Sequence, residues 1–436
     1  MKAEVLTIGD ELLRGEIVDS NKSHLSDRLL GLDIETHFHS SVRDDPADMR
    51  DALERAFGRS DIVLVSGGLG PTRDDLTTEV LAETLGRKLL LDPASLETIR
   101  AFFASVGREM AANNEKQAWF PEGAEVLANP IGTAPGFLVE EQGTLVFCMP
   151  GVPRELYRMM DEQVLPRITA RMGGERLVVR AKLLRTFGIG ESSLDAELSD
   201  IASDGDVTLG FRTAFPDNYL RPLARAATAE EADAKLDRVC AQIRERLGPI
   251  VYGEGADTLE IVVGRELRER GKMLAVAESC TGGLIAERLT DVAGSSAYFL
   301  GGVVAYSNEA KQALLGIDSA LLGEHGAVSE PVARAMAEAA RARFGADLAI
   351  ATTGISGPDG GTEEKPVGLV YIALASGSGT HCDRRVFPLD RARHRQLTAH
   401  TALDWVRRSL LNVDWSGPSL VREPSASGGP GGSGGQ

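Results

Sequence analysis

Three nucleophilic side chains lie next to one another in the stretch AVAESCTGG, residues 275–283. A small apolar run, typical of a buried strand, ends there at Ser279, Cys280 and Thr281, and two glycines follow. Glycines permit a tight turn into a helix, whose N-terminus presents unpaired N–H groups and the positive end of the helix dipole. A serine beside such donors is suited to attack a carbonyl, because the donors would stabilise the oxyanion. The alternative is an ordinary N-cap.

A lysine follows in the stretch AYSNEAK, which contains Tyr306, Ser307, Asn308 and Lys311. Ser307 or Asn308 can cap a helix, and Lys311 then lies about one turn inside it. A lysine can serve as a general base if desolvation or another cation lowers its pKa. The alternative is a solvated surface lysine, which is the usual environment of this residue type.

A second apolar run ends in hydroxyls and glycines in the stretch ATTGISGPDGG, residues 351–361. Ligands of open α/β sheets bind at loops that follow strand carboxyl ends. Donors to a polar ligand could therefore come from Thr352, Thr353, Gly354 and Ser356. A glycine-rich connection without a ligand is the alternative.

Arg391 and Arg395 are spaced by four residues, so they share one helix face if that segment is helical. Guanidinium groups hold phosphates through paired hydrogen bonds, which makes the two arginines a candidate phosphate clamp. A solvated basic helix face is the alternative.

Near the N-terminus, the glycine-rich stretch SGGLGPTRDD, residues 66–75, follows an apolar strand pattern. Its backbone can approach a phosphate closely, although it is neither a Walker motif nor a GxGxxG fingerprint. A helix is predicted over residues 72–86, so Asp74 and Asp75 could simply complement its dipole. Asp10 and Glu11 follow the first predicted strand, and carboxylates at adjacent strand ends could share a magnesium-type cation.

Two other features of this region are weaker. The stretch NPIGTAPGF, residues 129–137, is another polar glycine loop, which strengthens the prediction of a ligand site in this domain. His37 and His39 share one face of a predicted strand. Two histidines without a third ligand are more typical of a surface than of a metal site.

The length of 436 residues favours two or three domains. Strand and helix patterns alternate over residues 1–172, which predicts a parallel sheet with helices on both faces. The order β-α-β-β-α-β over residues 175–253 predicts a small ferredoxin-like α+β domain. A third α/β domain is predicted over residues 256–413, and the Gly-, Ser- and Pro-rich tail 416–436 is predicted to be disordered.

The overall composition excludes several classes of protein. A net charge of −17 argues against a polyanion-binding surface. The four cysteines form no CxxC pair, so neither a zinc knuckle nor a disulfide framework is indicated. Apolar runs are too short for a signal peptide or a membrane span, and we therefore expect a cytoplasmic protein that does not enter the membrane.

The third domain resembles the C-terminal domain of the CinA family nearly throughout residues 256–412. The stretches that carry this resemblance are AESCTGG, AGSSAYFLGGVVAYSNEAK, GAVSEP, TTGISGPDGGTEEKPVG and DR…R. The resemblance implies hydrolysis of the carboxamide of nicotinamide mononucleotide, giving nicotinic acid mononucleotide and ammonia, with no cofactor required. An amidase needs a nucleophile, an oxyanion site and a proton donor for ammonia, and these stretches can supply them.

On this resemblance Ser279 is the nucleophile, and Lys311 is the base that activates it and later protonates ammonia. Thr281 is the alternative nucleophile, whereas Cys280 is weaker because a neighbour on a strand points elsewhere. Thr281, Tyr306, Thr353 and Gly354 would position the amide. The residues assigned to substrate binding are Gly282, Gly283, Asn308, Thr353, Gly354, Ser356, Arg391 and Arg395.

The first domain resembles the molybdopterin-binding, MoaB/MogA-like domain in its CinA form, over about residues 1–170. The stretches IGDELLRGEIVDSN, GGLGPTRDD, NPIGTAPGF and MPGVPREL carry this resemblance. It implies a metal-dependent hydrolysis of ADP-ribose to AMP and ribose 5-phosphate, with magnesium or a transition metal as the divalent cation. Asp10, Asp74 and Asp75 would handle metal and water. The residues assigned to the diphosphate are Gly67, Gly68, Gly70, Thr72, Asn129 and Thr133.

The leading hypothesis is a bifunctional enzyme of pyridine-nucleotide salvage, and the resemblance suggests a homodimer. In a second hypothesis the first domain only binds a nucleotide and regulates the third domain. In a third, the chain is a non-enzymatic partner in competence or DNA repair. Its acidic charge argues against direct nucleic-acid binding.

Overall fold

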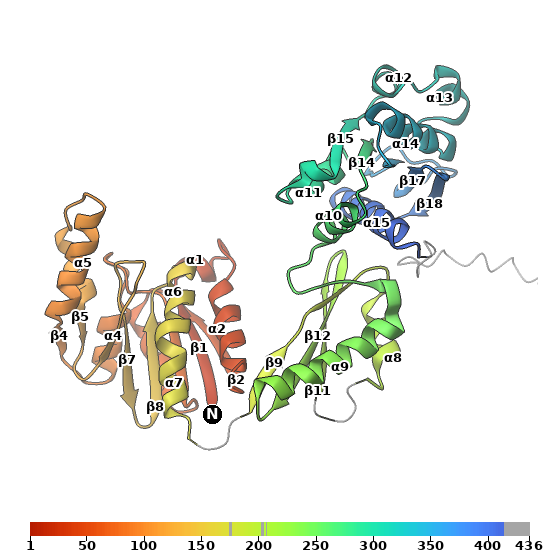
Figure 1. The fold of residues 1–436 in the computed structure, drawn as a ribbon. Coiled ribbons are helices and arrows are strands. Elements are labelled where there is room, and N and C mark those ends of the chain that lie inside the picture. Colours follow the sequence, from red (N-terminus) through yellow and green to blue (C-terminus); the bar gives the residue numbers. More distant parts are fainter. Residues whose placement is uncertain (174–176, 202–204, 206, 414–436) are drawn as a thin grey trace, which may run out of the picture. The chain divides into compact units, whose positions relative to one another are not determined.

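The computed structural model describes residues 1–173, 177–201, 205 and 207–413 (Figure 1). The predicted disordered tail, residues 416–436, lies outside the described residues. The chain divides into two compact units. The first contains Met1–Arg180 and Arg225–Asp233, and the second contains Ala181–Ala224 and the chain from Ala234 onward.

The first unit contains a mixed sheet of strand order β2-β1-β3-β8-β7-β6. Its strands are β1 (Lys2–Ile8), β2 (Glu35–Val42), β3 (Ile62–Ser66), β6 (Glu125–Leu127), β7 (Gly136–Glu141) and β8 (Thr144–Met149). β2, β1, β3 and β8 are parallel, as the alternation of strands and helices predicted, whereas β7 is antiparallel to both of its neighbours. The parallel strands end at one edge of the sheet, where the predicted glycine loop follows β3.

Helices cover both faces of this sheet, because alternate strand residues point to opposite sides. Val5 and Leu64 pack under α2, α6 and α7, whereas Leu6 and Val65 pack under α3 and α4. The helices are α1 (Asp10–Leu13), α2 (Ser20–Leu30), α3 (Pro46–Phe57), α4 (Thr77–Thr84), α5 (Pro93–Ser105), α6 (Pro153–Met159) and α7 (Leu165–Arg171). A π-helical turn, η2 (Met160–Val164), joins α6 to α7. The first unit also contains a 3₁₀ turn, η1 (Ala112–Ala118), and a small antiparallel pair of strands, β4 (Leu89–Leu91) and β5 (Trp119–Pro121).

The helix predicted over residues 72–86 begins only at Thr77, so Asp74 and Asp75 do not lie in its first turn. The Asp75 carboxylate accepts from the Thr72 amide at 2.8 Å and from the Thr72 hydroxyl at 2.5 Å. Such local bonds from a side chain to the backbone compete with helix formation. The two aspartates therefore belong to the glycine loop rather than to α4.

The middle domain confirms the predicted β-α-β-β-α-β order. Its elements are β9 (Val178–Ala181), β10 (Leu184–Thr186), α8 (Glu191–Leu198), β11 (Val207–Ala214), β12 (Asp217–Ala226), α9 (Ala229–Leu247), η3 (Gly248–Ile250) and β13 (Val251–Glu254). The sheet has the order β11-β12-β10-β13, and β9 also pairs with β12. The first predicted strand is thus divided between β9 and β10, which use the same partner.

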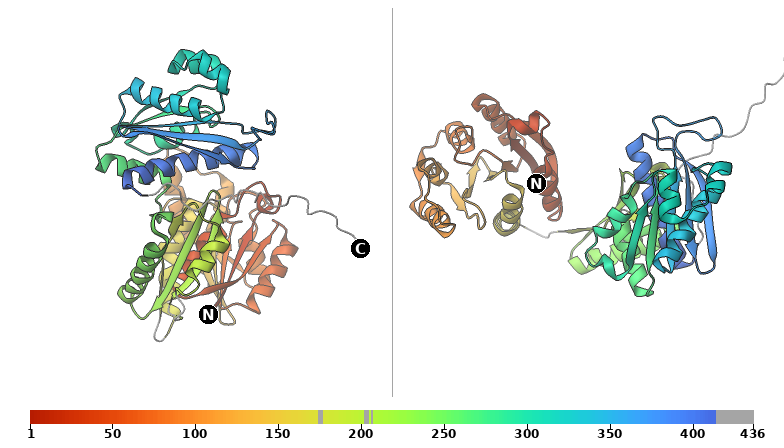
Figure 2. Two further views of the ribbon diagram at one scale, coloured as in Figure 1. Left: turned by 90° about the vertical axis from the view of Figure 1, so that its right-hand side faces the viewer. Right: turned by 90° about the horizontal axis from the view of Figure 1, so that it is seen from above.

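The C-terminal domain has a sheet of order β15-β14-β16-β17-β18 between two layers of helices, which the left view of Figure 2 shows. The strands are β14 (Leu274–Glu278), β15 (Phe299–Val304), β16 (Leu348–Gly354), β17 (Leu369–Ser376) and β18 (Gly379–Val386). β15, β14 and β16 run parallel, and the remaining pairs are antiparallel.

The two faces of this sheet differ in side-chain size. Large residues such as Leu274 and Val276 pack against α10 (Leu259–Glu269), α11 (Leu284–Thr290) and α15 (Arg391–Leu411). Alanines, among them Ala275 and Ala277, face the other layer. That layer contains α12 (Asn308–Leu315), α13 (Ser319–His325) and α14 (Glu330–Phe344), and η4 (Ser295–Ala297) precedes β15. Small side chains let the helix that carries Lys311 approach the sheet closely.

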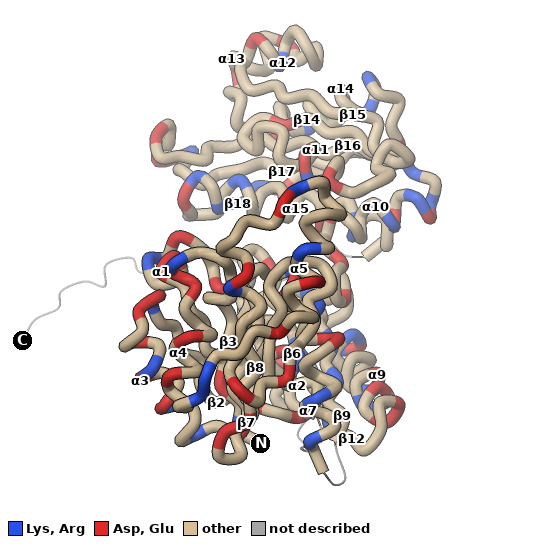
Figure 3. Tube along the Cα trace, turned by 90° about the vertical axis from the view of Figure 1, so that its left-hand side faces the viewer, with Lys and Arg blue, Asp and Glu red and all other residues tan. Residues whose placement is uncertain are grey.

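Charged residues of both signs are interspersed along the helices of each unit (Figure 3). Most of the excess of acidic over basic residues lies in the first domain, since residues 1–170 carry a net charge of −12 out of the total of −17. Among the helices of the described residues, none is long and apolar enough to cross a bilayer.

Two helical glycines allow the packing of the second unit to be tested. A Cβ atom on Gly264 of α10 would lie 2.6 Å from the hydroxyl oxygen of buried Tyr298, whereas Gly323 of α13 has no atom within 4 Å of that position. We expect Gly264→Ala to lower the unfolding free energy by about 1–3 kcal/mol through overpacking. Gly323→Ala should raise it by about 0.5–1 kcal/mol through helix propensity. Urea titrations that gave both variants the same sign would contradict this packing.

Candidate active site

Ser279 lies in the turn that follows β14, and its hydroxyl contacts a lysine. Its amide donates to the Thr352 carbonyl at 3.0 Å, which anchors the turn to the neighbouring strand β16. Lys311 Nζ lies 3.1 Å from Ser279 Oγ. The Ser279 residue is only 8% exposed, so the contact is largely shielded from solvent. The structure therefore brings together the two residues that the sequence assigned to nucleophile and base.

Lys311 is 1% exposed and lies in the first turn of α12, which Ser307 caps as predicted. Besides Ser279, its Nζ contacts the carbonyl oxygens of Ala305 at 2.8 Å and Tyr306 at 3.5 Å. Within the described part of the chain it forms no ion pair. Burial lowers the pKa of Lys311 because desolvation penalises the ammonium form. A neutral lysine can accept the serine proton, so the pair is suited to generate an alkoxide.

The other two nucleophilic side chains of the turn have different partners. The Thr281 residue is fully buried, and its hydroxyl lies 2.8 Å from that of Thr352. Cys280 packs in the hydrophobic core, and burial raises its pKa to about 12. A thiol with that pKa is almost entirely protonated at neutral pH. The geometry therefore favours Ser279 over both alternatives.

The N-terminus of α11 does not supply free donors to an oxyanion, contrary to the expectation from the sequence. The buried Glu278 carboxylate accepts from the amides of Gly283 at 3.0 Å, Ile285 at 3.1 Å and Ala286 at 2.9 Å. Gly283 has φ 96°, a left-handed conformation that favours glycine. Glu278 was not among the predicted residues, although an acidic residue just before a predicted helix was a usable signal.

Several predicted binding residues surround the Ser279 turn. Thr353 is buried, and its hydroxyl donates to the Ala327 carbonyl at 2.8 Å. Gly354 allows close packing, because a Cβ atom there would lie 2.6 Å from the Leu369 carbonyl oxygen. Ser356 is buried, and within the described residues its hydroxyl has no hydrogen-bond partner. This hydroxyl is available to a ligand.

Tyr306 and Asn308 lie at the exposed side of the same region, in the segment that joins β15 to α12. Tyr306 is 57% exposed, and Asn308, the first residue of α12, is also exposed. Neither residue is buried with Lys311, so both are placed to meet a ligand from solvent rather than to assist the proton transfer itself.

Arg391 and Arg395 lie on α15, as the predicted spacing on one helix required. Arg395 donates to the Thr281 carbonyl at 3.2 Å and 2.8 Å. Arg391 donates to the Gly357 carbonyl at 2.9 Å and to the Tyr306 hydroxyl at 2.8 Å. Arg395 therefore holds the Ser279 turn, and the exposed Arg391 remains the better candidate for a phosphate contact.

The first unit contains a separate cavity of about 500 Å³ at the carboxyl edge of its sheet. Six of the predicted residues line it: Gly67, Gly68, Gly70, Asp74, Asp75 and Thr133. Asp44 and Glu155 were not among the predicted residues, and Glu11 was predicted only as a possible cation ligand. These three acidic residues also line the cavity. Asp44 follows the end of β2, so the pattern that selected Asp10 could have found it. Burial raises the pKa of Asp44, and the nearby Glu11 carboxylate adds to this.

Three predicted residues of the first unit do not line this cavity. The Asp10 carboxylate binds Arg14 and, at 3.4 Å, Arg43. The Thr72 hydroxyl donates to Asp74 and Asp75. Asn129 organises its own loop, since its side chain donates to the Ala134 carbonyl at 2.9 Å and accepts from the Gly132 amide at 3.0 Å. In the described residues no group of three or more His, Cys, Asp or Glu side chains is arranged to hold a metal ion.

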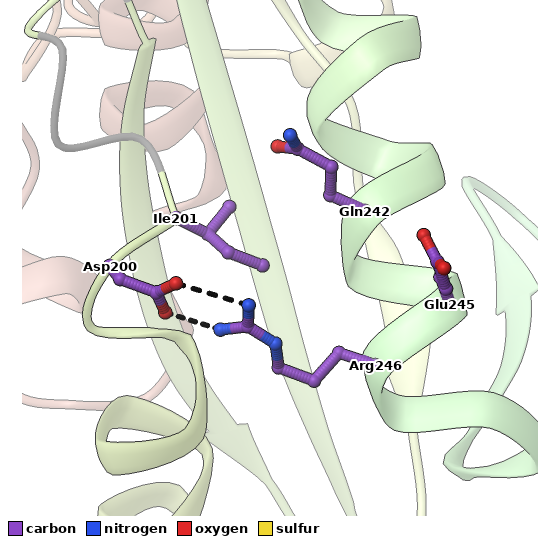
Figure 4. A pocket seen from close by; sticks show the side chains of 5 residues that line it. All are labelled: Asp200, Ile201, Gln242, Glu245 and Arg246. Carbon is purple, nitrogen blue, oxygen red and sulfur yellow. Dashed lines mark hydrogen bonds and ion pairs between the residues drawn. The ribbon is translucent and has the colours of Figure 1, made fainter.

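A further cavity, of about 400 Å³, lies in the middle domain beside α9 (Figure 4). Asp200 and Arg246 form a paired ion bridge across it, and Ile201, Gln242 and Glu245 complete the lining. None of the residues assigned to a site lines this cavity. His37 and His39 are both exposed on β2, in agreement with a surface role.

Three family models of known proteins match successive parts of the chain. Residues 256–410 match the family model CinA C-terminal domain, residues 181–253 match Damage-inducible protein CinA KH domain, and residues 4–170 match Probable molybdopterin binding domain. The middle domain is thus KH-like.

Relatives match the chain over nearly its whole length. A CinA-like protein from Geobacter sulfurreducens is 46% identical over 415 residues, covering 95% of this chain and 100% of the relative. One from Anaeromyxobacter dehalogenans is 45% identical over 413 residues, covering 94% and 100%. The solved structure of competence/damage inducible protein CihA from Agrobacterium tumefaciens is 42% identical and covers 35% of this chain and 93% of its own, with a TM-score of 0.34.

The lowered pKa of Lys311 predicts a pH-dependent stability. The unfolded chain binds a proton at Lys311 more readily than the folded chain, so the unfolding free energy rises with pH between the folded pKa and the ordinary value of 10.5. The slope is at most about 1.4 kcal/mol per pH unit. Lys311→Met lacks this contribution. The wild-type stability minus that of Lys311→Met should therefore increase from pH 7 to pH 10 in urea titrations, and a flat or falling difference would contradict the lowered pKa.

Proposed function

The chain belongs to the CinA family, and we propose that its C-terminal domain hydrolyses the carboxamide of nicotinamide mononucleotide to nicotinic acid mononucleotide and ammonia. The observation that carries this proposal is the buried contact of 3.1 Å between Lys311 Nζ and Ser279 Oγ. A hydroxyl beside a lysine with a lowered pKa is an activated nucleophile, and an amide is the substrate that requires one.

The reaction follows from the partners of these two residues. Neutral Lys311 accepts the Ser279 proton while Ser279 Oγ attacks the carboxamide carbon, and the carbonyl oxygen becomes an oxyanion. Protonated Lys311 then gives its proton to the amide nitrogen, the C–N bond breaks, and ammonia leaves an ester on Ser279. Water attacks this ester with Lys311 again as base. The products are the free carboxylate and the regenerated serine hydroxyl.

The surroundings of the pair favour a nucleotide over a simple amide. Arg391 is exposed at the first turn of α15 and contacts the Tyr306 hydroxyl at 2.8 Å. A guanidinium there can bind a phosphate, and the exposed Tyr306 ring can contact a pyridine or a ribose. The free Ser356 hydroxyl offers a further hydrogen bond to substrate. These contacts support the choice of nicotinamide mononucleotide that the family resemblance suggested.

Ammonia release from nicotinamide mononucleotide tests the proposal. Ser279→Ala and Lys311→Ala should each lower kcat by about 10³-fold or more, because they act as one unit. Cys280→Ala is the matched control, and it should keep wild-type kcat. In the wild type kcat/KM should rise with pH as Lys311 loses its proton. An active Ser279→Ala together with an inactive Thr281→Ala would instead assign the nucleophile to Thr281, and an inert wild type would refute the deamidase.

For the first domain we propose hydrolysis of ADP-ribose to AMP and ribose 5-phosphate in the cavity lined by the 66–75 loop. The support is a combination of glycine backbone, which can approach a diphosphate closely, with the carboxylates of Glu11, Asp44, Asp74, Asp75 and Glu155. Carboxylate oxygens suit a hard divalent cation, and magnesium commonly binds one or two of them together with water and phosphate oxygens. Such an ion would neutralise charge on the diphosphate when it is bound. Asp44 and Asp74, which both line the cavity, would hold it or orient water.

Carboxamide variants distinguish the acidic residues of this cavity from Asp10. Asp44→Asn and Asp74→Asn should lower the rate of AMP formation from ADP-ribose by about 10²-fold or more, since each removes a charge beside the diphosphate. Asp10→Asn should change it by less than about 3-fold, because that carboxylate binds Arg14 and Arg43 instead. Chelation of divalent cations should abolish the rate, and added magnesium should restore it.

The opposite pattern, with Asp10→Asn inactive and Asp44→Asn active, would overturn the assignment of these residues. Binding of ADP-ribose without turnover would instead favour the hypothesis of a regulatory nucleotide-binding domain. Association with DNA at physiological salt would favour a partner role in competence or repair.

A further inference from the structure

Glu278 is a buried carboxylate directly before the nucleophile, and the proposed reaction does not use it. It is the last residue of β14 and is 0% exposed. Both of its oxygens accept hydrogen bonds from the start of α11: Oε2 from Gly283 and Ile285, and Oε1 from Ala286. A buried carboxylate is costly unless its lone pairs are satisfied, and here backbone amides satisfy them.

These bonds close the segment between β14 and α11 into a fixed loop. The Glu278 backbone belongs to β14, where its carbonyl accepts from the Ala305 amide at 2.8 Å, while its side chain holds the helix that follows. The turn between these two anchors carries Ser279. From the opposite side, Arg395 of α15 donates to the Thr281 carbonyl. The position of Ser279 Oγ relative to Lys311 therefore depends on side chains that touch neither atom.

The same bonds determine which amides remain free. The amides of Gly283, Ile285 and Ala286 are engaged by Glu278, and the Ser279 amide by Thr352. Over the described residues, the amides of Cys280 and Thr281 donate to no backbone carbonyl. Free N–H groups one and two residues after a nucleophile are suited to receive an oxyanion.

We infer that Glu278 is a positioning residue: by binding the α11 amides it holds the turn 279–283 so that Ser279 faces Lys311 and the Cys280 and Thr281 amides stay free for the oxyanion. The inference rests on the proposed amide hydrolysis at Ser279. It assigns to Glu278 no contact with substrate.

Glu278→Gln is the sharpest variant, because it keeps the side-chain size. One glutamine oxygen can still accept, but the amide nitrogen would face a backbone N–H that then loses its acceptor. We expect kcat for nicotinamide mononucleotide to fall about 10- to 100-fold, with KM changed by less than about 3-fold, since the loss is of transition-state stabilisation. The pH dependence of kcat/KM should stay that of the wild type, because Lys311 is unaltered. Glu287→Gln, on the exposed face of the same helix, is the matched control and should leave both constants unchanged.

A structural role alone would lower the thermal midpoint and the folded fraction of Glu278→Gln, yet leave kcat per folded molecule unchanged, and that result would overturn the inference. If Glu278→Gln does not fold, Glu278→Asp provides the same comparison, because a shorter carboxylate cannot reach all of the amides.

Labelling of Ser279 by a fluorophosphonate separates this inference from the proposed substrate. The probe needs an activated serine but no nicotinamide, and Ser279→Ala supplies its background. Slower labelling of Glu278→Gln, by about 10-fold or more, supports the positioning role even if the wild type does not hydrolyse nicotinamide mononucleotide. Equal labelling of wild type and Glu278→Gln refutes the positioning role. If the wild type still turns over nicotinamide mononucleotide in that case, the proposed function stands without the positioning role.

Discussion

The site in the C-terminal domain depends on the parallel register of β14 and β15. Glu278 pairs with Val304, so the chains leave the two strands side by side, and the Ala305 amide donates to the Glu278 carbonyl at 2.8 Å. That register sets Ser279 beside the carbonyls of Ala305 and Tyr306, to which Lys311 Nζ is bound. A shift of one residue in either strand would turn alternate side chains to the opposite face of the sheet. The contact between Ser279 and Lys311 thus depends first on the pairing of β14 with β15.

Packing on the two faces of the sheet supports this arrangement in different ways. The alanine face lets the helix layer of α12 and α14 approach, so Lys311 enters the interior rather than extending into solvent. The face with larger residues anchors α15, whose first two turns carry Arg391 and Arg395 to the loops after β14 and β16. Helices from both layers therefore meet at one edge of the sheet. Burial of a lysine costs free energy, but at this site it also lowers the pKa of Lys311, which must act as a base.

Periodicity predicted most of the elements, because these depend on short stretches of sequence, whereas the pairing of Ser279 with Lys311 was assigned from the family resemblance. The 3.6-residue pattern located α3 with Met49 and Leu53 buried. Two of the failures involve charged side chains with a partner distant in sequence, whereas the partners of Glu278 and Asp75 are local. Asp10 turns to Arg43, and Arg395 binds the Thr281 carbonyl 114 residues away. No local pattern specifies such choices, because they depend on which groups the completed fold brings within reach.

One candidate site contains a buried acid, Asp44, and the other a buried base, Lys311, and burial disfavours the charged form of both. In the first unit burial raises the pKa of Asp44, and in the C-terminal domain it lowers the pKa of Lys311. In each case a low dielectric disfavours the charged form. The proposed role of Asp44 requires its charged form, which burial disfavours, because a carboxylate that holds a cation must be ionised. The proposed role of Lys311 requires its neutral form, which burial favours, because a base must be able to accept a proton. Both requirements are met on the alkaline side of the respective pKa. Deprotonation, which leaves Asp44 charged and Lys311 neutral, therefore favours both proposed reactions.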